Sequence, residues 1–164
     1  MAEKAQAPTW GEGAVADRLA ELGLERPAVA APGGSYVPAI RDGDLVLTSG
    51  QLPFVAGSLP ATGKVGAEVS AERARELARV CAVNAVAAVH ELIGDLDRVA
   101  QVVKVVGFVA SDPSFTGQPG VLNGASDVLA EIFGEAGRHA RSAVGVAVLP
   151  LDAPVEVEIT VRVR

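Results

Sequence analysis

The sequence predicts one α+β domain built in two layers, a mixed β-sheet with two helices on one face. A chain of 164 residues, of which 49% are hydrophobic, is long enough for one substantial core and short for two. Two long segments repeat apolar residues every three or four positions, as amphipathic helices do, and five others resemble strands. After a short leading helix the order is strand, strand, helix, strand, helix, strand, strand, which favours helices packed on one side of a mixed sheet.

The first third of the chain predicts a short helix, a loop and a β-hairpin. Residues 14–24 place apolar side chains near helical spacing and end close to a glycine. Residues 25–36 contain two prolines and a pair of glycines, which indicate a loop. The hairpin has its turn at Asp42-Gly43, and its second strand lies in residues 45–50.

Two amphipathic helices flank a buried strand in the middle of the chain. Ser70 is expected to cap the first helix and Gly94 to end it, while Gly134 ends the second. The β-branched residues 99–110 predict the strand, and residues 111–120 predict a loop. Apolar positions of the first helix are Ala74, Leu77, Ala78, Cys81, Ala85, Ala88, Val89 and Leu92. Those of the second helix are Val121, Leu122, Ala125, Val128, Leu129, Ile132 and Phe133.

The last two strands predict a second sheet face that helices do not cover. In residues 155–163 every second residue is apolar and is expected to meet the helices, while the others are mostly charged. In residues 141–149 the bulky side chains are expected to meet the same helices; these are Val144, Val146 and Val148. The opposite face then carries Arg141, Ala143, Gly145 and Ala147. Because that face is rich in small residues, another subunit is expected to cover it.

The charged residues of these strands have two interpretations. An unpaired ion at a subunit interface is costly, so it must pair, meet water or await a ligand, and an arginine fork suits a ligand carboxylate. Alternatively, Glu156 and Glu158 lie on a solvated face, and Arg141 pairs with one of them. The pattern of residues alone leaves both interpretations open.

Charge and cysteine content argue against several classes of protein. The formal net charge is −6 and no run of Lys or Arg interrupts it, so a nucleic-acid partner is disfavoured. The single cysteine, Cys81, excludes a disulfide within the chain and is expected to be buried as a small apolar residue. Residues 1–13 contain no signal-peptide core, and no segment has the ~20 apolar residues of a membrane span, so a cytoplasmic location is expected.

Three sequence segments closely resemble the Rid (reactive intermediate deaminase, YjgF-type) family, also labelled endoribonuclease L-PSP-like. They are "GSYVPAIRDGDLVLTSGQLP", "ARSAVGVAVLP" and "VEVEITV", and the resemblance runs from about Pro32 to Val163. Residues 32–164 would then form the Rid-like domain, and residues 1–31 an N-terminal extension with a short helix. This extension and the lengthened connection "FVAGSLPATGKVGA" indicate a longer subgroup of the family.

The resemblance implies a chorismate-mutase-like fold and a homotrimer whose sheets form an internal barrel, with a cleft between each pair of neighbouring subunits. It implies hydrolysis of reactive 2-imino and 2-enamino acids to 2-keto acids and ammonia. Arg141 would bind the carboxylate of this small metabolite, and Glu156 would orient the attacking water. The substrate-binding residues would be Tyr36, Ser49, Gly50, Asn123 and Ala143. Imine hydrolysis requires no metal and no organic cofactor, so none is expected.

Two departures from the family pattern favour a second reading, a non-catalytic trimer that binds small metabolites. Ala143 stands where many family deaminases have cysteine, and Ser35 stands where proline is common. An endoribonuclease, which the family label suggests, is disfavoured by the acidic charge. Structural alternatives also exist for three residues: Tyr36 at the rim of a core, Ser49 as a hydrogen bonder at a strand end, and Asn123 as a stabiliser of a helix start.

Overall fold

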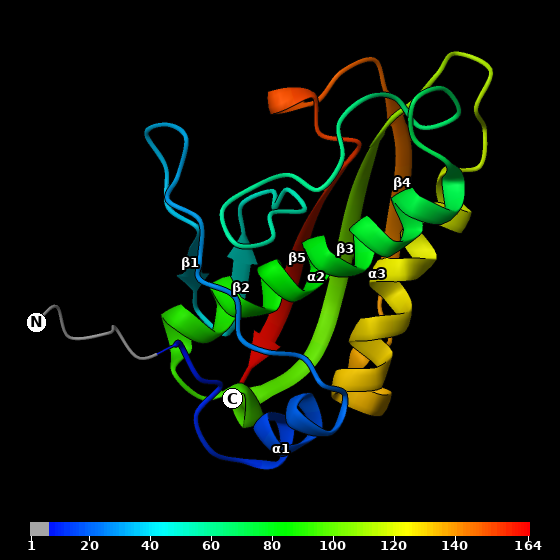
Figure 1. Cartoon of the computed structure of the whole chain (residues 1–164). Coiled ribbons are helices and arrows are strands. Elements are labelled where there is room, and N and C mark those ends of the chain that lie inside the picture. Colours follow the sequence, from blue (N-terminus) through cyan, green and yellow to red (C-terminus); the bar gives the residue numbers. More distant parts are fainter. Residues whose placement is uncertain (1–6) are drawn as a thin grey trace, which may run out of the picture.

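The computed structural model describes residues 7–164, which form a five-stranded mixed sheet with helices on one side (Figure 1). The strands are β1 (Ala39–Asp42), β2 (Leu45–Thr48), β3 (Val99–Ala110), β4 (Ala140–Val146) and β5 (Val155–Val163). Their order in the sheet is β1-β2-β5-β3-β4, and only β3 and β4 run parallel. Residues 1–6 lie outside the described residues. They are part of residues 1–13, for which the sequence predicts no signal peptide.

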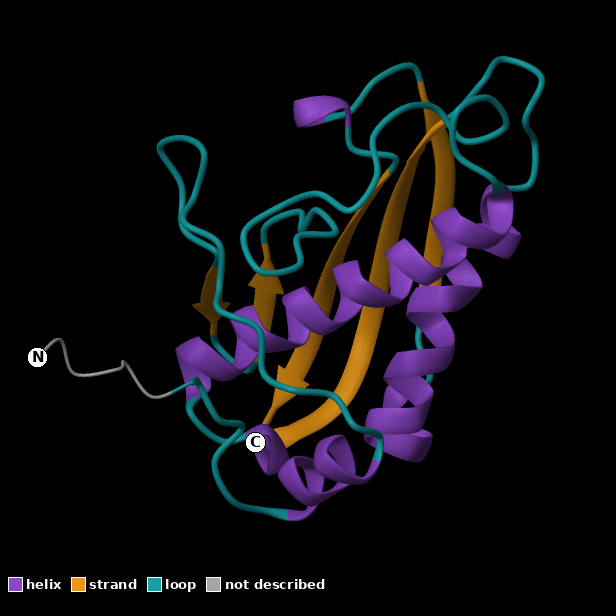
Figure 2. Cartoon of the chain, in the orientation of Figure 1, coloured by secondary structure: helices purple, strands orange, loops and turns teal. Residues whose placement is uncertain are grey.

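The helices α2 (Ala71–Ile93) and α3 (Gln118–Phe133) cover one face of this sheet, as Figure 2 shows. The short helix α1 (Ala14–Glu21) packs against α3 and the turn Leu96–Arg98 at one end of the sheet. The predicted α+β class, the two layers and the order of elements are therefore confirmed. The division of the chain at residue 31 stays a prediction, although Leu19 of α1 is fully buried in the common core.

Local sequence signals set the ends of these elements as expected. The Ser70 hydroxyl accepts a hydrogen bond of 3.1 Å from the backbone N–H of Arg73, and Gly94 ends α2 in the left-handed region with φ 75°. Gly43, with φ 60°, makes the turn of the β1–β2 hairpin. The helix α3 begins at Gln118, inside the segment expected to be loop, because Pro119 fits the first turn of a helix.

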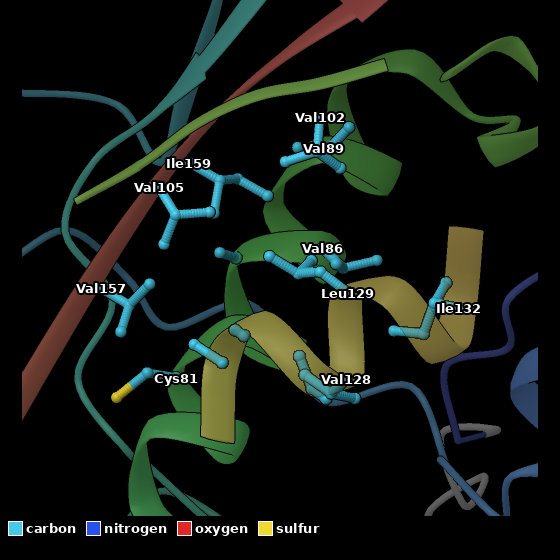
Figure 3. Packing of buried hydrophobic residues seen from close by; sticks show 14 of the residues in the cluster. Cys81, Val86, Val89, Val102, Val105, Val128, Leu129, Ile132, Val157 and Ile159 are labelled. Carbon is cyan, nitrogen blue, oxygen red and sulfur yellow. The ribbon is translucent and has the colours of Figure 1, made fainter. Parts of the chain in front are cut away.

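The core lies between α2, α3 and the covered sheet face, and small branched side chains fill it (Figure 3). Cys81 is fully buried among them, as predicted. At Gly124 a Cβ atom would lie 2.0 Å from the backbone oxygen of Arg75, so the absence of a side chain lets α3 approach α2 closely. Tight packing over many small contacts thus compensates for a sequence in which only 4% of the residues are aromatic.

The predicted orientation of β4 is wrong, and strand register explains why. Arg141 lies beside Val105 of β3, and Ala143 lies beside Gly107. Because paired residues of neighbouring strands point to the same side, Arg141 and Ala143 face the helices with the buried Val105. Val144, which is 44% exposed, lies on the uncovered face instead. The orientation is therefore reversed for Arg141, Ala143, Gly145, Val144 and Val146, and Val148, which lies beyond the end of β4, is 68% exposed.

Among residues 7–164 no helix combines the length and the apolar composition that crossing a bilayer requires.

Candidate functional site

The residues proposed from sequence fall into two groups in the structure, and the first surrounds a pocket beside β5. This Glu156 pocket has a volume of about 320 Å³. Tyr36 comes from the loop before β1, Gly50 from the segment after β2, and Glu156 from β5. The other lining residues are Ala30, Ala31, Pro32, Gly33, Pro38, Gln51, Leu52, Phe54, Pro150 and Leu151. The pocket therefore offers one carboxylate within a largely apolar wall.

Gly50 and the carboxylate of Glu156 are in close contact. A Cβ atom on Gly50 would lie 1.9 Å from Glu156 Oε1, so any side chain at this position would displace the carboxylate. Burial raises the pKa of Glu156, and the neighbouring charge of Glu158 raises it further. Within residues 7–164 the carboxylate has neither a hydrogen bond nor an ion pair. Glu156 is thus a partly desolvated proton acceptor whose oxygens remain available.

Backbone pairing holds Gly50 against β5. Gln51 and Val157 exchange two backbone hydrogen bonds, of 2.8 and 3.1 Å, which extend the sheet past the end of β2. The Ser49 hydroxyl donates to the Val37 carbonyl at 2.6 Å, which fits a hydrogen bonder at a strand end. Tyr36 is 53% exposed, and its hydroxyl accepts from the Gly33 backbone N–H at 3.1 Å. Tyr36 therefore lies at the pocket rim and not in a core.

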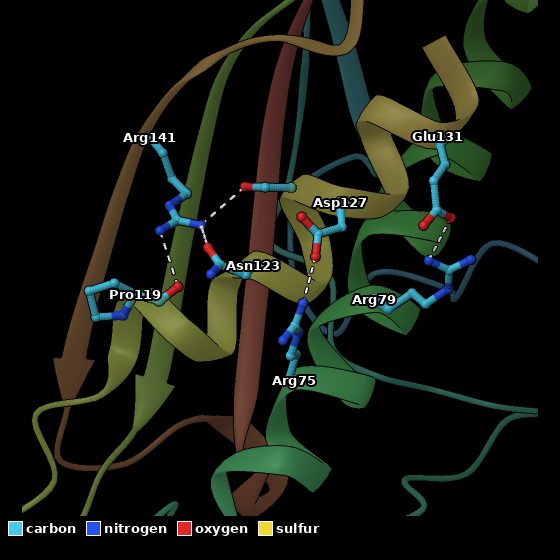
Figure 4. Close-up of polar contacts among 8 residues, drawn as sticks. Arg75, Arg79, Pro119, Asn123, Asp127, Glu131 and Arg141 are labelled. Atoms are coloured by element: carbon cyan, nitrogen blue, oxygen red, sulfur yellow. Dashed lines mark hydrogen bonds and ion pairs between the residues drawn. The ribbon is translucent and has the colours of Figure 1, made fainter. Parts of the chain in front are cut away.

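The second group is centred on Arg141 at the edge strand β4 and the first half of α3 (Figure 4). Arg141 Nη1 donates to Asn123 Oδ1 at 2.9 Å and to Ser126 Oγ at 3.1 Å, while Nη2 donates to the Pro119 carbonyl at 3.1 Å. Asn123 is thus an acceptor for the guanidinium. Of the five N–H groups of Arg141, the Nε–H and one N–H of Nη2 remain without a partner in residues 7–164.

His139 extends this network, a contact that the sequence did not indicate. The nitrogen His139 Nδ1 lies 2.7 Å from the Gly137 carbonyl and must donate to it, so the neutral ring accepts at Nε2. The Ser126 hydroxyl lies 2.9 Å from Nε2, donates to it, and still accepts from Arg141. A continuous chain of hydrogen bonds therefore fixes the guanidinium. Asn123 and Ser126 are three residues apart on one helix face, which is the only sequence signal that linked them.

The two groups do not meet within one chain. Arg141 faces α3, whereas Glu156 is paired with Phe108 and points to the uncovered side of the sheet. The alternative that Arg141 pairs with Glu156 or Glu158 is wrong for residues 7–164, where Arg141 forms no ion pair. Ala143 packs partly against the core beside β3. Those residues also contain no cluster of three His, Cys, Asp or Glu that suits a metal ion.

Comparisons with known proteins identify a family for this chain. The profile described as "YjgF/chorismate mutase-like, putative endoribonuclease" matches residues 16–161. Protein TCP17 of Trypanosoma cruzi is 47% identical over 155 residues, 93% of this chain and 96% of that protein. A RutC family protein of Haemophilus influenzae is 37% identical and covers 79% of this chain and 88% of its own. The crystal structure of a "putative endoribonuclease" from Shewanella oneidensis has a TM-score of 0.89 and 36% identity, covering 92% of this chain and 100% of that one.

Proposed function

The chain belongs to the YjgF/chorismate mutase-like family, and from this premise we propose that it hydrolyses reactive 2-imino and 2-enamino acids. The products are a 2-keto acid and ammonia, and no cofactor takes part. The reaction takes place at clefts between the subunits of a homotrimer. The observation that carries this proposal is the carboxyl group of Glu156. It lies in a pocket, its pKa is raised, and it has no hydrogen-bond or ion-pair partner in residues 7–164.

Glu156 has the properties of a general base for water. A carboxylate whose pKa is raised by burial binds a proton more readily than an exposed one, which favours proton transfer from a water molecule near neutral pH. The absence of a side chain at Gly50 leaves the space that the carboxylate occupies. The apolar wall of the pocket excludes other water from the reacting carbon.

Arg141 has the properties of a carboxylate anchor. Its contacts with Asn123, Ser126 and Pro119 hold the guanidinium before any ligand arrives, and its two free N–H groups match the two oxygens of a carboxylate. Because Arg141 and Glu156 lie on opposite faces of the sheet within one chain, one subunit supplies the anchor and its neighbour the base. This requirement supports a trimer with shared clefts.

The reaction balances with water as the only co-reactant. Glu156 accepts a proton as the water oxygen bonds to C2 of the imine, and the nitrogen gains a proton to give a 2-amino-2-hydroxy acid. Glu156 then transfers the hydroxyl proton to the amino nitrogen, the C2=O double bond forms, and the C2–N bond breaks with its electron pair leaving on nitrogen as ammonia. An enamine first tautomerises to the imine. Binding the carboxylate orients C2 towards Glu156, and such orientation is a large part of catalysis in bimolecular reactions.

A non-catalytic trimer that binds small metabolites in the same clefts is the second candidate. Ala143 supports it because this position, beside Gly107 of β3 and near the Arg141 anchor, carries no thiol. The related Shewanella oneidensis protein is described as a "putative endoribonuclease", but a net charge of −6 opposes RNA binding by this chain.

Release of ammonia and keto acid from 2-imino acids distinguishes these candidates. An amino-acid oxidase generates the imine in situ, and the wild-type protein is expected to accelerate product release above the buffer rate. Arg141→Ala is expected to lower kcat/KM by about 10²–10³-fold because the anchoring contacts are lost. Arg138→Ala is the matched control, since Arg138 is exposed and pairs only with Glu135. If ammonia release with the wild-type protein is no faster than in buffer, the deaminase function is refuted. The non-catalytic metabolite-binding trimer is then the remaining candidate.

A further inference from the structure

The two segments that mark the longer subgroup enclose a second cavity that the proposed reaction does not use. The strap, residues 24–31, and the loop, residues 54–57, lie over α2 on the side away from the sheet (Figure 1). Together with Arg79, Val80, Val83 and Asn84 of α2 they line an α2 groove of about 850 Å³. Cavities of this size and composition are typical of small-molecule sites.

The groove suits an apolar ligand. Leu24, Pro27, Val29 and Val55 supply apolar walls, and Val55 is 52% exposed. Each of its two arginines already has an acidic partner. Arg26 pairs with Glu91 at 3.3 Å, and Arg79 pairs with Glu131 at 2.8 Å. The groove therefore offers mainly hydrocarbon contact, and both of its arginines are ion-paired, although the buried Arg26 Nε has no hydrogen-bond partner in residues 7–164.

The α2 groove and the Glu156 pocket share a wall. Ala30, Ala31 and Phe54 line both cavities. The side chain of Asn84 fixes the backbone of this wall, because its Nδ2 donates to the carbonyls of Leu52 at 3.0 Å and Phe54 at 3.2 Å. The Glu156 pocket and the α2 groove are therefore adjacent, and Ala30, Ala31 and Phe54 lie where the two cavities border each other.

We propose that the α2 groove receives the apolar side chain of the substrate, so that the preferred substrates are 2-imino acids with side chains of about six carbons. The head of such a molecule occupies the Glu156 pocket, and its tail passes over Ala30, Ala31 and Phe54. This inference rests on the proposed function but adds a substrate class to it. The strap and the loop are then specificity elements, since both walls of the groove come from them.

Calorimetric binding of two stable keto acids tests the inference without catalysis. Pyruvate and 2-oxooctanoate share the same head, and the second has five additional methylenes. A fully buried methylene contributes about fourfold in affinity, so half-covered methylenes contribute about twofold each and about thirtyfold together. Wild type is expected to bind 2-oxooctanoate about thirtyfold more tightly than pyruvate. Equal affinities for the two acids overturn the inference.

Filling the groove is expected to abolish this preference. Ala28→Trp adds a large side chain from the exposed strap, and Val80→Trp adds one from α2. Either variant is expected to weaken 2-oxooctanoate binding to the level of pyruvate while leaving pyruvate binding unchanged. Ala20→Trp, at an exposed position of α1 outside both cavities, is the control. Unchanged long-chain binding in both folded variants contradicts the proposal.

Turnover separates this inference from the proposed function. Ammonia release from 2-iminopropanoate, the short substrate, depends on Glu156 and the Arg141 anchor but not on the α2 groove, whereas 2-iminooctanoate also needs the groove. If the short substrate is hydrolysed and kcat/KM is no higher for the long substrate, the α2 groove does not bind the substrate's side chain. The proposed deaminase function is then still supported. If wild type binds 2-oxooctanoate tightly, Ala28→Trp abolishes this binding and neither substrate is hydrolysed, the α2 groove is confirmed as the binding site of the apolar tail. The deaminase function is then refuted.

Discussion

The two faces of the five-stranded sheet differ in how fully one chain completes them. On β5 the side chains that meet the helices, from Val155 to Val163, are at most 3% exposed. The same strand places Glu156 and Glu158 on the other face, where Ile40, Leu47 and Val144 are also exposed. The covered face is finished by α2 and α3, whereas the uncovered face combines apolar side chains with carboxylates that lack partners in residues 7–164. Substitutions on the first should affect folding, and substitutions on the second should affect assembly and chemistry.

The largest effect, on the oligomeric state, is expected from a charged side chain introduced on the uncovered face of the sheet. Leu47→Asp places a carboxylate at the proposed subunit interface, where burying an unpaired charge costs several kcal/mol. Light scattering should show a mass about three times 16.7 kDa for the wild type and 16.7 kDa for the variant. Leu92→Asp, at the 45% exposed Leu92 of α2, should leave the mass unchanged. A monomeric wild type would refute the trimer.

The second largest effect is expected from a substitution that creates a cavity on the covered face of the sheet. Leu129 of α3 is fully buried, so Leu129→Ala should lower the free energy of unfolding by about 3 kcal/mol. Urea denaturation measures this loss, and the exposed Leu92→Ala should cost less than about 1 kcal/mol. Equal losses at the two leucines would mean that the faces do not differ as described.

Gly50→Ala should separate chemistry from folding. The new Cβ atom displaces the Glu156 carboxylate, which can rotate away, so kcat/KM for imine hydrolysis should fall about tenfold or more while the melting temperature changes little. Gly120→Ala is the matched control, because no atom lies within 4 Å of the position of its Cβ and its φ is not positive. Wild-type activity in Gly50→Ala would argue against Glu156 as the base.

The network behind Arg141 should give a smaller effect. Ser126→Ala removes the link between His139 and the guanidinium, so KM should rise about fivefold with kcat nearly unchanged. His139→Ala should act in the same direction, and the two effects should not add. Ser126→Thr, which keeps the hydroxyl, should restore KM. A change in kcat alone would show that this network does not position the anchor.

The smallest effect concerns pH and Glu156. Because the folded state raises the pKa of Glu156, it binds the proton more tightly than the unfolded chain, and stability falls as pH rises from the unfolded pKa of about 4.3 through the folded pKa. Glu156→Gln should therefore melt slightly higher than wild type at pH 8, with the difference disappearing near pH 4. The shift should be small because the carboxyl is partly exposed. A variant that melts lower at pH 8 would contradict the burial argument.

Several elements were predictable because their signals are local. Ser70 and Gly94 bound α2 through their own backbone contacts, and the turn at Gly43 needs only its own residues. The orientation of β4 was not predictable in this way. The size of its valines suggested the wrong face, and the register against β3 decided the right one.

The sequence by itself determined the α+β class, the helices and strands, the buried face of β5 and the family, because periodicity and motifs act over short stretches of chain. The tertiary structure alone decided that Arg141 faces α3, that Ser126 and His139 support it, and that Arg141 and Glu156 lie on opposite faces. It also brought residues 24–31 and 54–57 together over α2. The physical reason is that strand register and loop packing depend on partners far away in sequence, and no local pattern encodes them.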